Sequence, residues 1–276
     1  MVATIQNDLT NQHWEETVRL ILANERKYHK AFFGKIFDLT AFMRVLKDYG
    51  PEDLARWTSL YLEPHFLPEV DILPWNDFPG WRIKIGKLFY EAAGSNGSKI
   101  MCRQENDVLG HDHKFYKLPG RTVLIDTRLK NHKMMDNDML MGDIMIWLRR
   151  ERRIKTFREL PLSSRFGPSS NDWDQQIRPA LIKALGFKPR QVRLEKVVEA
   201  NTIPQIYPHM PRLNDGKFQT EVWCEEFCAE PCKESCCTSI NRFSGGIERY
   251  GGLSYFSPMD RSDRWMQRAF RPIFVL

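Results

Sequence analysis

The hydrophobic pattern of this chain changes at Gly120, and this change limits the folds that the chain can adopt. Before Gly120, apolar residues recur mostly at helical spacing. After it, residues 122–127 (TVLIDT) form an apolar, β-branched run that is typical of a largely buried strand. Two segments with helical spacing and several short strand-like runs follow. This order predicts an α+β domain, which we assign to residues 117–276.

Two helices are expected after the first strand of this domain. The first begins at Asn137 or Asp138, and the second follows residues 169–170 and ends at Gly186. Pro179, inside the second helix, predicts a kink. The side chains expected to face the core are Leu140, Ile144, Trp147 and Leu148 in the first helix, and Trp173, Ile177, Leu181 and Ala184 in the second. Later strands are predicted at residues 191–195, 221–223, 252–256 and 270–276.

Residues 1–116 are predicted to be mainly helical. Asn11 can cap a first helix, a second helix runs near residues 38–49, and Gly50 ends it before Pro51 begins a third. The prolines that then break the chain into loops and short extended pieces are Pro64, Pro68, Pro74 and Pro79. The sequence indicates no role for this region.

Five short motifs follow one another near the C-terminus. They are residues 222–226 (VWCEE), 244–246 (SGG), 251–253 (GGL), 262–265 (SDRW) and 269–272 (AFRP). Their order resembles the end of C-type-lectin-like proteins of the formylglycine-generating-enzyme type, in which a Trp-acid strand precedes a Gly-Gly turn and a closing Phe-Arg strand. It is more similar still to the variable proteins of diversity-generating retroelements. The upstream strand, the two helices and residues 193–195 agree in order, so the resemblance covers about residues 117–276.

The resemblance implies a C-type-lectin-like fold that serves as a rigid frame for a diversified binding surface. In that family, mutagenesis directed at adenines rewrites exposed residues near the C-terminus. The implied frame residues are Gly245, Gly246, Gly251, Gly252, Leu253, Phe270, Arg271 and Pro272. The implied ligand-binding residues are Arg249, Tyr250, Ser254, Tyr255, Ser257, Met259, Arg261, Asp263, Trp265, Gln267 and Arg268.

The residue types of this window favour binding independently of the resemblance. Its glycines permit tight backbone turns. Between them, Tyr, Trp, Arg, Ser and Asp alternate with small apolar residues, a mixture typical of antibody-like binding surfaces. The alternative is that these are ordinary loop residues with a few core aromatics. We expect a non-enzymatic protein that recognises a protein or glycan ligand through this surface.

The cysteines are concentrated in one segment of the C-terminal region. Five of the six form a C-x3-C-x3-C-x3-C-C array, namely Cys224, Cys228, Cys232, Cys236 and Cys237. A structural zinc or Fe–S site, disulfides, and unpaired thiols all stay open for this array. Formylglycine-generating relatives oxidise a substrate cysteine through a copper-binding cysteine pair, whereas the cysteines here fall elsewhere in the pattern. An oxidoreductase is therefore only the alternative function. We expect no required cofactor, and a structural zinc stays one of the open interpretations of the array.

The net charge of +6 and the pI of about 9.0 are compatible with a nucleic-acid-associated protein, which is a second alternative. The densest basic run, residues 149–153, lies at the end of a predicted helix, where cations interact favourably with the helix dipole. The sequence contains no zinc finger, RNP-type aromatic motif or basic zipper. Nucleic acid is therefore not the partner that we expect.

Neither a membrane span nor an export signal is evident in the sequence. No apolar stretch reaches the length that spans a bilayer. The first residues have neither the basic start nor the apolar core of a secretory signal. We therefore expect a soluble protein that is cytoplasmic, virion-associated or exported by an unconventional route. The sequence indicates neither the ligand nor the oligomeric state.

Two further pairs of side chains are weaker candidates for chemistry. His111 and His113 lie on one side of an extended segment within reach of one metal ion, but no third ligand is near in the sequence, which favours a solvated loop. Glu195 and Glu199 are four residues apart, as an acid pair would be. A structural, hydrogen-bonding role for Glu195 is favoured.

Overall fold

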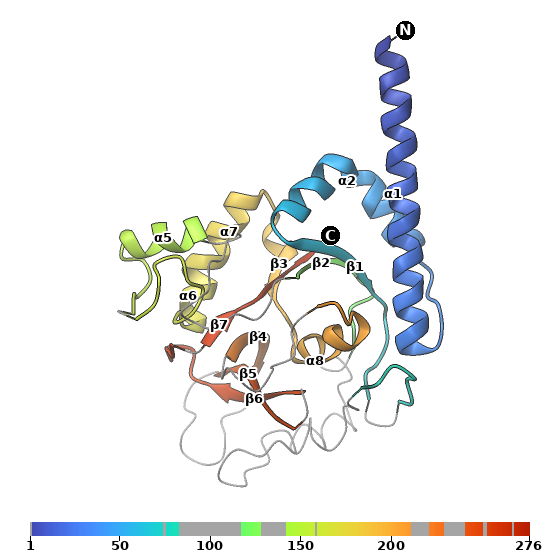
Figure 1. Cartoon of the computed structure of the whole chain (residues 1–276). Coiled ribbons are helices and arrows are strands. Elements are labelled where there is room, and N and C mark those ends of the chain that lie inside the picture. The colour runs from blue at the N-terminus through green and yellow to red at the C-terminus, as the bar shows by residue number, and fades with distance from the viewer. Residues whose placement is uncertain are drawn as a thin grey trace.

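The computed structural model describes residues 2–73, 76–82, 117–127, 142–157, 159–210, 221–228, 241–250, 253–266 and 268–276. Within them the chain has an α+β fold, as the sequence predicts, with helices and two four-stranded sheets (Figure 1). The helices are α1 (Val2–Phe33), α2 (Thr40–Ser59), α5 (Gly142–Arg150), α6 (Ser170–Asp172), α7 (Arg178–Leu185) and α8 (Val197–Ile206). A π-helical turn (Trp173–Ile177) joins α6 to α7, and a 3-10 turn (Pro189–Gln191) follows α7.

The strands form two separate sheets. The first sheet has the order β1-β2-β8-β3, and its neighbouring strands are antiparallel. The second has the order β6-β5-β4-β7, with β4 and β7 parallel and the other pairs antiparallel. The bounds are β1 (Leu62–Leu67), β2 (Arg121–Asp126), β3 (Val192–Leu194), β4 (Glu221–Cys228), β5 (Asn241–Tyr250), β6 (Leu253–Met259), β7 (Arg268–Phe270) and β8 (Pro272–Val275).

Both faces of the first sheet are buried. Successive side chains of a strand point to opposite faces. On one face, Val123, Ile125 and Ile273 pack with residues of α8 and of the C-terminal end of α1. On the other face, Leu124 and Phe274 pack with residues of α2, α5, the π-helical turn and α7. This burial on two sides explains why the sequence of β2 is apolar without alternation.

The N-terminal helices differ in part from the prediction. α1 is one continuous helix, and its N-terminal part extends beyond the other elements in Figure 1. The predicted cap at Asn11 is wrong, because Asn11 lies inside α1 and no glycine or proline precedes it to stop the helix. The predicted break before Pro51 is confirmed, because Gly50 has a φ of 83°, outside the helical range.

The strand β1 replaces the loops expected around Pro64. A proline is tolerated here because β1 is the edge of the first sheet, where one row of backbone groups has no partner strand. β1 pairs with β2 along its whole length, from Leu62 opposite Asp126 to Leu67 opposite Arg121. The region that we assign to residues 1–116 therefore shares a sheet with the C-terminal region.

The helix α5 buries only part of the predicted face: Leu148 is buried and Ile144 packs against the core, as expected, whereas Leu140 lies outside the described residues. Met145 and Leu148 are buried, whereas Trp147 is 46% exposed. Arg149, also on α5, is buried as well, and it donates hydrogen bonds to the carbonyls of Pro161 and Phe166. The expected inward position of Trp147 is therefore wrong.

The second predicted helix is confirmed with one change of phase. Trp173, Ile177 and Leu181 are fully buried, but Leu185 completes this face in place of Ala184, which is exposed. The π-helical turn accommodates an extra residue and so keeps the buried side chains four residues apart. Pro179 is the second residue of α7, so it lies in the first turn of that helix and not in a helix interior. Gly186 ends the helix with a left-handed φ of 73°, as expected.

Three other local expectations differ from the structure. Pro204, expected to follow a turn, lies inside α8. Gly245 and Gly246, expected in a turn, lie within β5, whose pairing with β6 shifts register between Gly245 and Ile247, as at a β-bulge. The last predicted strand is divided at Arg271 into β7 and β8, which belong to different sheets. None of the helices in the described residues is long and apolar enough to cross a membrane.

Candidate functional site

The predicted ligand-binding residues fall on the second sheet and on the loop that follows it. Arg249 and Tyr250 end β5. The residues on β6 are Ser254, Tyr255, Ser257 and Met259. Those after β6 are Arg261, Asp263 and Trp265 in the loop and Arg268 at the start of β7. Gln267 lies outside the described residues, and only the backbone is described for the residues on β5 and β6.

Strand pairing brings the predicted residues of β5 and β6 together. Glu248 lies opposite Ser254, and Tyr250 lies opposite Leu253. β6 is the edge of this sheet, and residues 260–266 continue from that edge.

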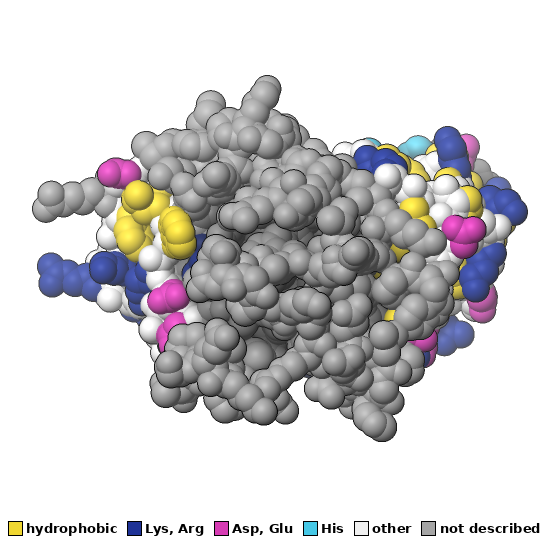
Figure 2. All heavy atoms as spheres, turned by 90° about the horizontal axis from the view of Figure 1, so that it is seen from below, with side chains coloured by type: hydrophobic (Ala, Val, Ile, Leu, Met, Phe, Trp, Pro, Cys, Tyr) yellow, Lys and Arg dark blue, Asp and Glu magenta, His cyan; other side chains and the backbone are white. Residues whose placement is uncertain are grey.

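Figure 2 views the molecule from the lower side of Figure 1, and where side chains are coloured, basic and acidic groups are interspersed.

The loop of residues 260–266, called the β6–β7 loop below, is fixed to α6 and to the π-helical turn after it. Arg264 forms a two-pronged ion pair with Asp172, in which Nη2 lies 3.0 Å from Oδ1 and Nη1 contacts Oδ2. Arg261 Nη2 lies 3.0 Å from Asp174 Oδ2. The backbone N–H of Asn171 donates to the carbonyl of Arg261 at 3.0 Å. The loop is thus held at two points along its length.

Arg268 belongs to the frame and not to the exposed surface. Its side chain is 1% exposed, so the expectation that it faces solvent differs from the structure. Its guanidinium lies over the rings of Trp223, at 4.6 Å, and Trp265, at 5.7 Å from the ring centroids. Trp265 itself is 51% exposed, and Asp263 is exposed too. The buried Arg268 therefore contacts the ring of Trp265, about half of which is exposed to solvent.

Only two of the five cysteines of the array lie within the described residues. Cys224 and Cys228 are on β4, where their backbone alone is described. Cys232, Cys236 and Cys237 lie outside the described residues. The choice between metal, disulfides and unpaired thiols therefore stays a prediction.

A second group of polar side chains lies where α1 packs against the edge strand β1. Glu25 is 1% exposed, and its carboxylate accepts hydrogen bonds from the Phe66 N–H at 2.9 Å, the Tyr207 hydroxyl at 2.7 Å and His65 Nδ1 at 2.9 Å. His29 Nε2 bonds to the carbonyl of Phe66 at 2.9 Å. Glu25 and His29 thus satisfy the backbone groups that an edge strand leaves without a partner strand.

The imidazole of His65 lies between two carboxylates. It is 2% exposed, and the ring of Tyr207 lies 3.9 Å from it between centroids. Burial alone would lower the pKa of His65, but the carboxylates of Glu25 and Glu63 raise it to about 9. Burial alone would raise the pKa of Glu25, but His65 and His29 lower it to about 2. Glu25 and His65 therefore form a charged pair at neutral pH.

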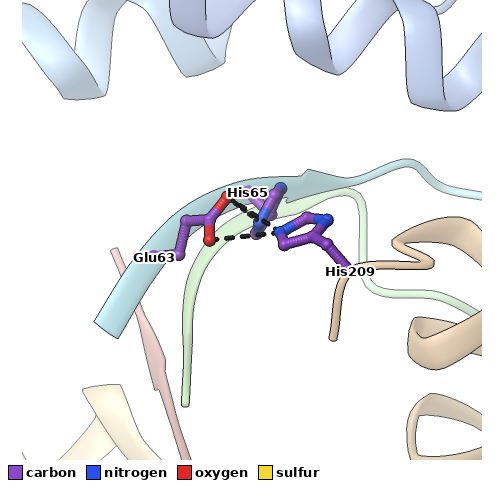
Figure 3. A group of neighbouring side chains, drawn as sticks. All are labelled: Glu63, His65 and His209. Atoms are coloured by element: carbon purple, nitrogen blue, oxygen red, sulfur yellow. Dashed lines mark hydrogen bonds and ion pairs between the residues drawn. The ribbon is translucent and has the colours of Figure 1, made fainter. Parts of the chain in front are cut away.

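Glu63, His65 and His209 bring three metal-ligating side chains to one point (Figure 3). Glu63 and His65 extend from β1, and His209 extends from the segment after α8. Glu63 Oε1 lies 3.1 Å from His65 Nε2 and 3.1 Å from His209 Nε2. One ligand atom from each of the three residues lies within 4.8 Å of the other two. Two imidazoles and a carboxylate are donors that divalent transition metals accept.

A pocket of about 500 Å³ adjoins this cluster between α1, α2 and β1. Its lining includes Glu63 and His65 from β1, Tyr28 from α1 and Thr58 from α2. Its walls are therefore mixed, with charged and hydroxyl groups among apolar side chains. A small polar molecule or water in this space would reach the cluster.

Sequence reasoning did not identify this cluster. Glu63 and His65 have the two-residue spacing that places side chains on one face of a strand, but Pro64 between them indicated a loop. His209 lies 146 residues from Glu63, so no local spacing connects them. The metal candidates that the sequence does indicate, His111 and His113, lie outside the described residues.

Comparison with known proteins gives no match for this chain, whether to a family model, to a curated protein or to a solved structure.

Proposed function

We propose that this protein is a non-enzymatic, C-type-lectin-like binding protein that recognises a protein or glycan through β5, β6 and the β6–β7 loop. The premise is the resemblance of residues 117–276 to the variable proteins of diversity-generating retroelements. One observation carries the proposal. Ion pairs of Arg261 and Arg264 hold the loop, while Asp263 and Trp265 are exposed on it.

The physical advantage of this arrangement is that the β6–β7 loop loses little conformational entropy when a ligand binds. A loop that is already fixed loses little conformational entropy on binding, so more of the contact energy appears as affinity. A tryptophan supplies a large contact area with only two rotatable side-chain bonds, and tryptophans are enriched among the residues that dominate binding energy. Trp265 on its Arg268 support fits this role.

The cysteine array has a supporting role in this proposal. β4, which carries Cys224 and Cys228, pairs with β5 next to the proposed surface. Structural zinc or disulfides at the array would tie the segment between β4 and β5 to the sheet. Both chemistries serve the same structural end, and measurement of metal content and free thiols distinguishes them.

The test compares two exposed tryptophans. The full chain is applied to immobilised glycan and cell-surface protein libraries, and each hit is measured with W265A and W147A. Trp147 is 46% exposed on α5, outside the proposed surface, and is the matched control. We expect W265A to weaken binding about tenfold or more, as at a binding hot spot, and W147A to leave binding unchanged. Equal affinities for W265A and the unaltered chain would contradict the proposal.

A further inference from the structure

We propose that Glu63, His65 and His209 form a binding site for one divalent first-row transition-metal ion, with Zn²⁺ as the reference ion. The site is separate from the proposed ligand-binding surface and lies where β1 meets the segment after α8 (Figure 3). Its protein donors would be the Nε2 atoms of the two histidines and a carboxylate oxygen of Glu63.

The spacing of the donors matches a small coordination shell. Zinc binds imidazole nitrogen and carboxylate oxygen at about 2.0–2.2 Å, and a tetrahedron of that size has donor–donor edges of about 3.3 Å. Glu63 Oε1 lies 3.1 Å from Nε2 of both His65 and His209. The two histidine nitrogens lie within 4.8 Å of each other, so the imidazoles would have to close on the ion for the third edge to match.

The buried nitrogen of His65 is an independent observation that points to a ligand. Nε2 of His65 is buried, and it lies 3.1 Å from Glu63 Oε1 in an ion pair that lacks hydrogen-bond geometry within the described residues. Its other nitrogen, Nδ1, donates to Glu25 at 2.9 Å. An ion pair without hydrogen-bond geometry satisfies a buried nitrogen only in part, and a metal ion coordinated by Nε2 would satisfy it directly.

The surroundings hold both rings in the orientation that coordination requires. A carboxylate that accepts from the second nitrogen of a ligating histidine fixes the ring and its tautomer, and Glu25 does this for His65. Tyr207 packs on His65, and Tyr28 stacks on His209 with ring centroids 5.3 Å apart. The ring orientations therefore do not depend on the ion.

The charges of the cluster also suit a divalent cation. Coordination requires a neutral imidazole, so the proton on His65 Nε2 would pass to solvent when the ion binds. Glu63 as a ligand and Glu25 through His65 would then balance the charge of +2. Three protein donors leave a coordination position for water or a small ligand. The pocket of about 500 Å³, which Glu63 and His65 line, offers the space for that fourth donor.

The test measures metal uptake by the full chain after removal of bound metal with a chelator. Zn²⁺ is titrated by calorimetry, and Co²⁺ is titrated by visible absorption, which also reports the donor type. The cysteine array can bind metal as well, so cysteines are alkylated in a parallel sample, and thiolate-to-cobalt charge-transfer bands identify that second site.

Three variants decide the result. We expect H209A and E63Q each to lose one equivalent of metal relative to the unaltered chain, and H13A, which removes an exposed histidine of α1, to lose none. The alkylated sample should keep the same one-equivalent difference. His209 is 37% exposed at its side chain, so its replacement tests ligation with little loss of packing. The proposal is overturned if the alkylated chain takes up no metal, or if H209A and E63Q both bind as much as H13A.

Discussion

Replacement of Arg193 by alanine should be among the most destabilising changes to a polar residue of this protein. Arg193 on β3 forms a two-pronged ion pair with Glu199 on α8, with both nitrogen–oxygen distances at 2.6 Å. The carboxylate of Glu199 is fully buried, and the Arg193 side chain is 14% exposed. R193A would leave the buried carboxylate of Glu199 without its arginine partner, although the backbone N–H of Lys196 would still donate to it.

The expected cost follows from this burial. Removal of one partner of a buried ion pair costs about 3–5 kcal/mol, whereas exposed pairs are worth about 1 kcal/mol or less. The free energy of unfolding of a folded protein is typically about 5–15 kcal/mol, so a loss of this size should lower the urea concentration at the unfolding midpoint strongly. The double variant R193M/E199Q removes both charges and should recover much of the loss. A cost below about 1 kcal/mol for R193A would refute the reasoning from burial.

The pH dependence of R193A provides a second check. Burial alone would raise the pKa of Glu199, but the charge and hydrogen bonds of Arg193 and the Lys196 N–H lower it. In the unaltered chain this pair therefore stabilises the fold fully above the unfolded-state pKa and less as the pH falls through the folded-state pKa. Without Arg193, burial should raise the pKa, so the deficit of R193A should shrink as the pH falls and Glu199 takes up a proton. A deficit that stays constant with pH would contradict this.

Three further changes have expected outcomes in chemical denaturation. L124A, in the middle of the first sheet with no exposed surface, should lower the free energy of unfolding by about 2–5 kcal/mol, and a loss under 1 kcal/mol would contradict the two-sided burial. G167A should cost about 1–3 kcal/mol, because Gly167 has a φ of +90° and a Cβ there would lie 2.5 Å from Phe157 Cδ2; an unchanged midpoint would argue against that backbone. R261A should change stability by less than about 1 kcal/mol, because its ion pair with Asp174 is partly exposed, and a larger loss would assign that pair a role in folding.

The parts of the fold that the sequence predicts are those with strong local signals. Val123, Leu124 and Ile125 form an apolar run because both sides of β2 are covered, and that pattern is visible in one segment of sequence. Gly186 ends its helix in the left-handed region that glycine favours, which is likewise a local property. Gly50 breaks α2 for the same reason.

The parts that the sequence does not predict depend on distant contacts. β1 is a strand because β2 pairs with it and because Glu25 binds its outer edge at Phe66. Arg149 is held on the buried side of α5 by its hydrogen bond to the carbonyl of Pro161, and this rotation of the helix leaves Trp147 exposed. Pro204 lies inside α8, although a proline in a helical segment usually marks the end of the helix.

The same distinction separates the two candidate sites. The binding surface could be predicted from the sequence because its residues lie in one continuous window, and it stays a prediction. The sequence did not show that Arg268 is buried against Trp265. The metal cluster combines Glu63 and His65 with a histidine from a remote segment, His209. Only the folded chain brings these three side chains together, so spacing in the sequence carries no signal for the complete set.

The most direct test of the proposed binding function is to sequence this gene and its flanking DNA in several strains. We predict a nearby reverse-transcriptase gene and a template repeat that differs from the gene at adenines. Substitutions should concentrate at exposed positions such as Asp263 and Trp265, while Arg264 and Arg268, which hold the frame, stay constant. A window from residue 249 to 268 that is as constant as the rest of the chain would contradict a diversified binding surface.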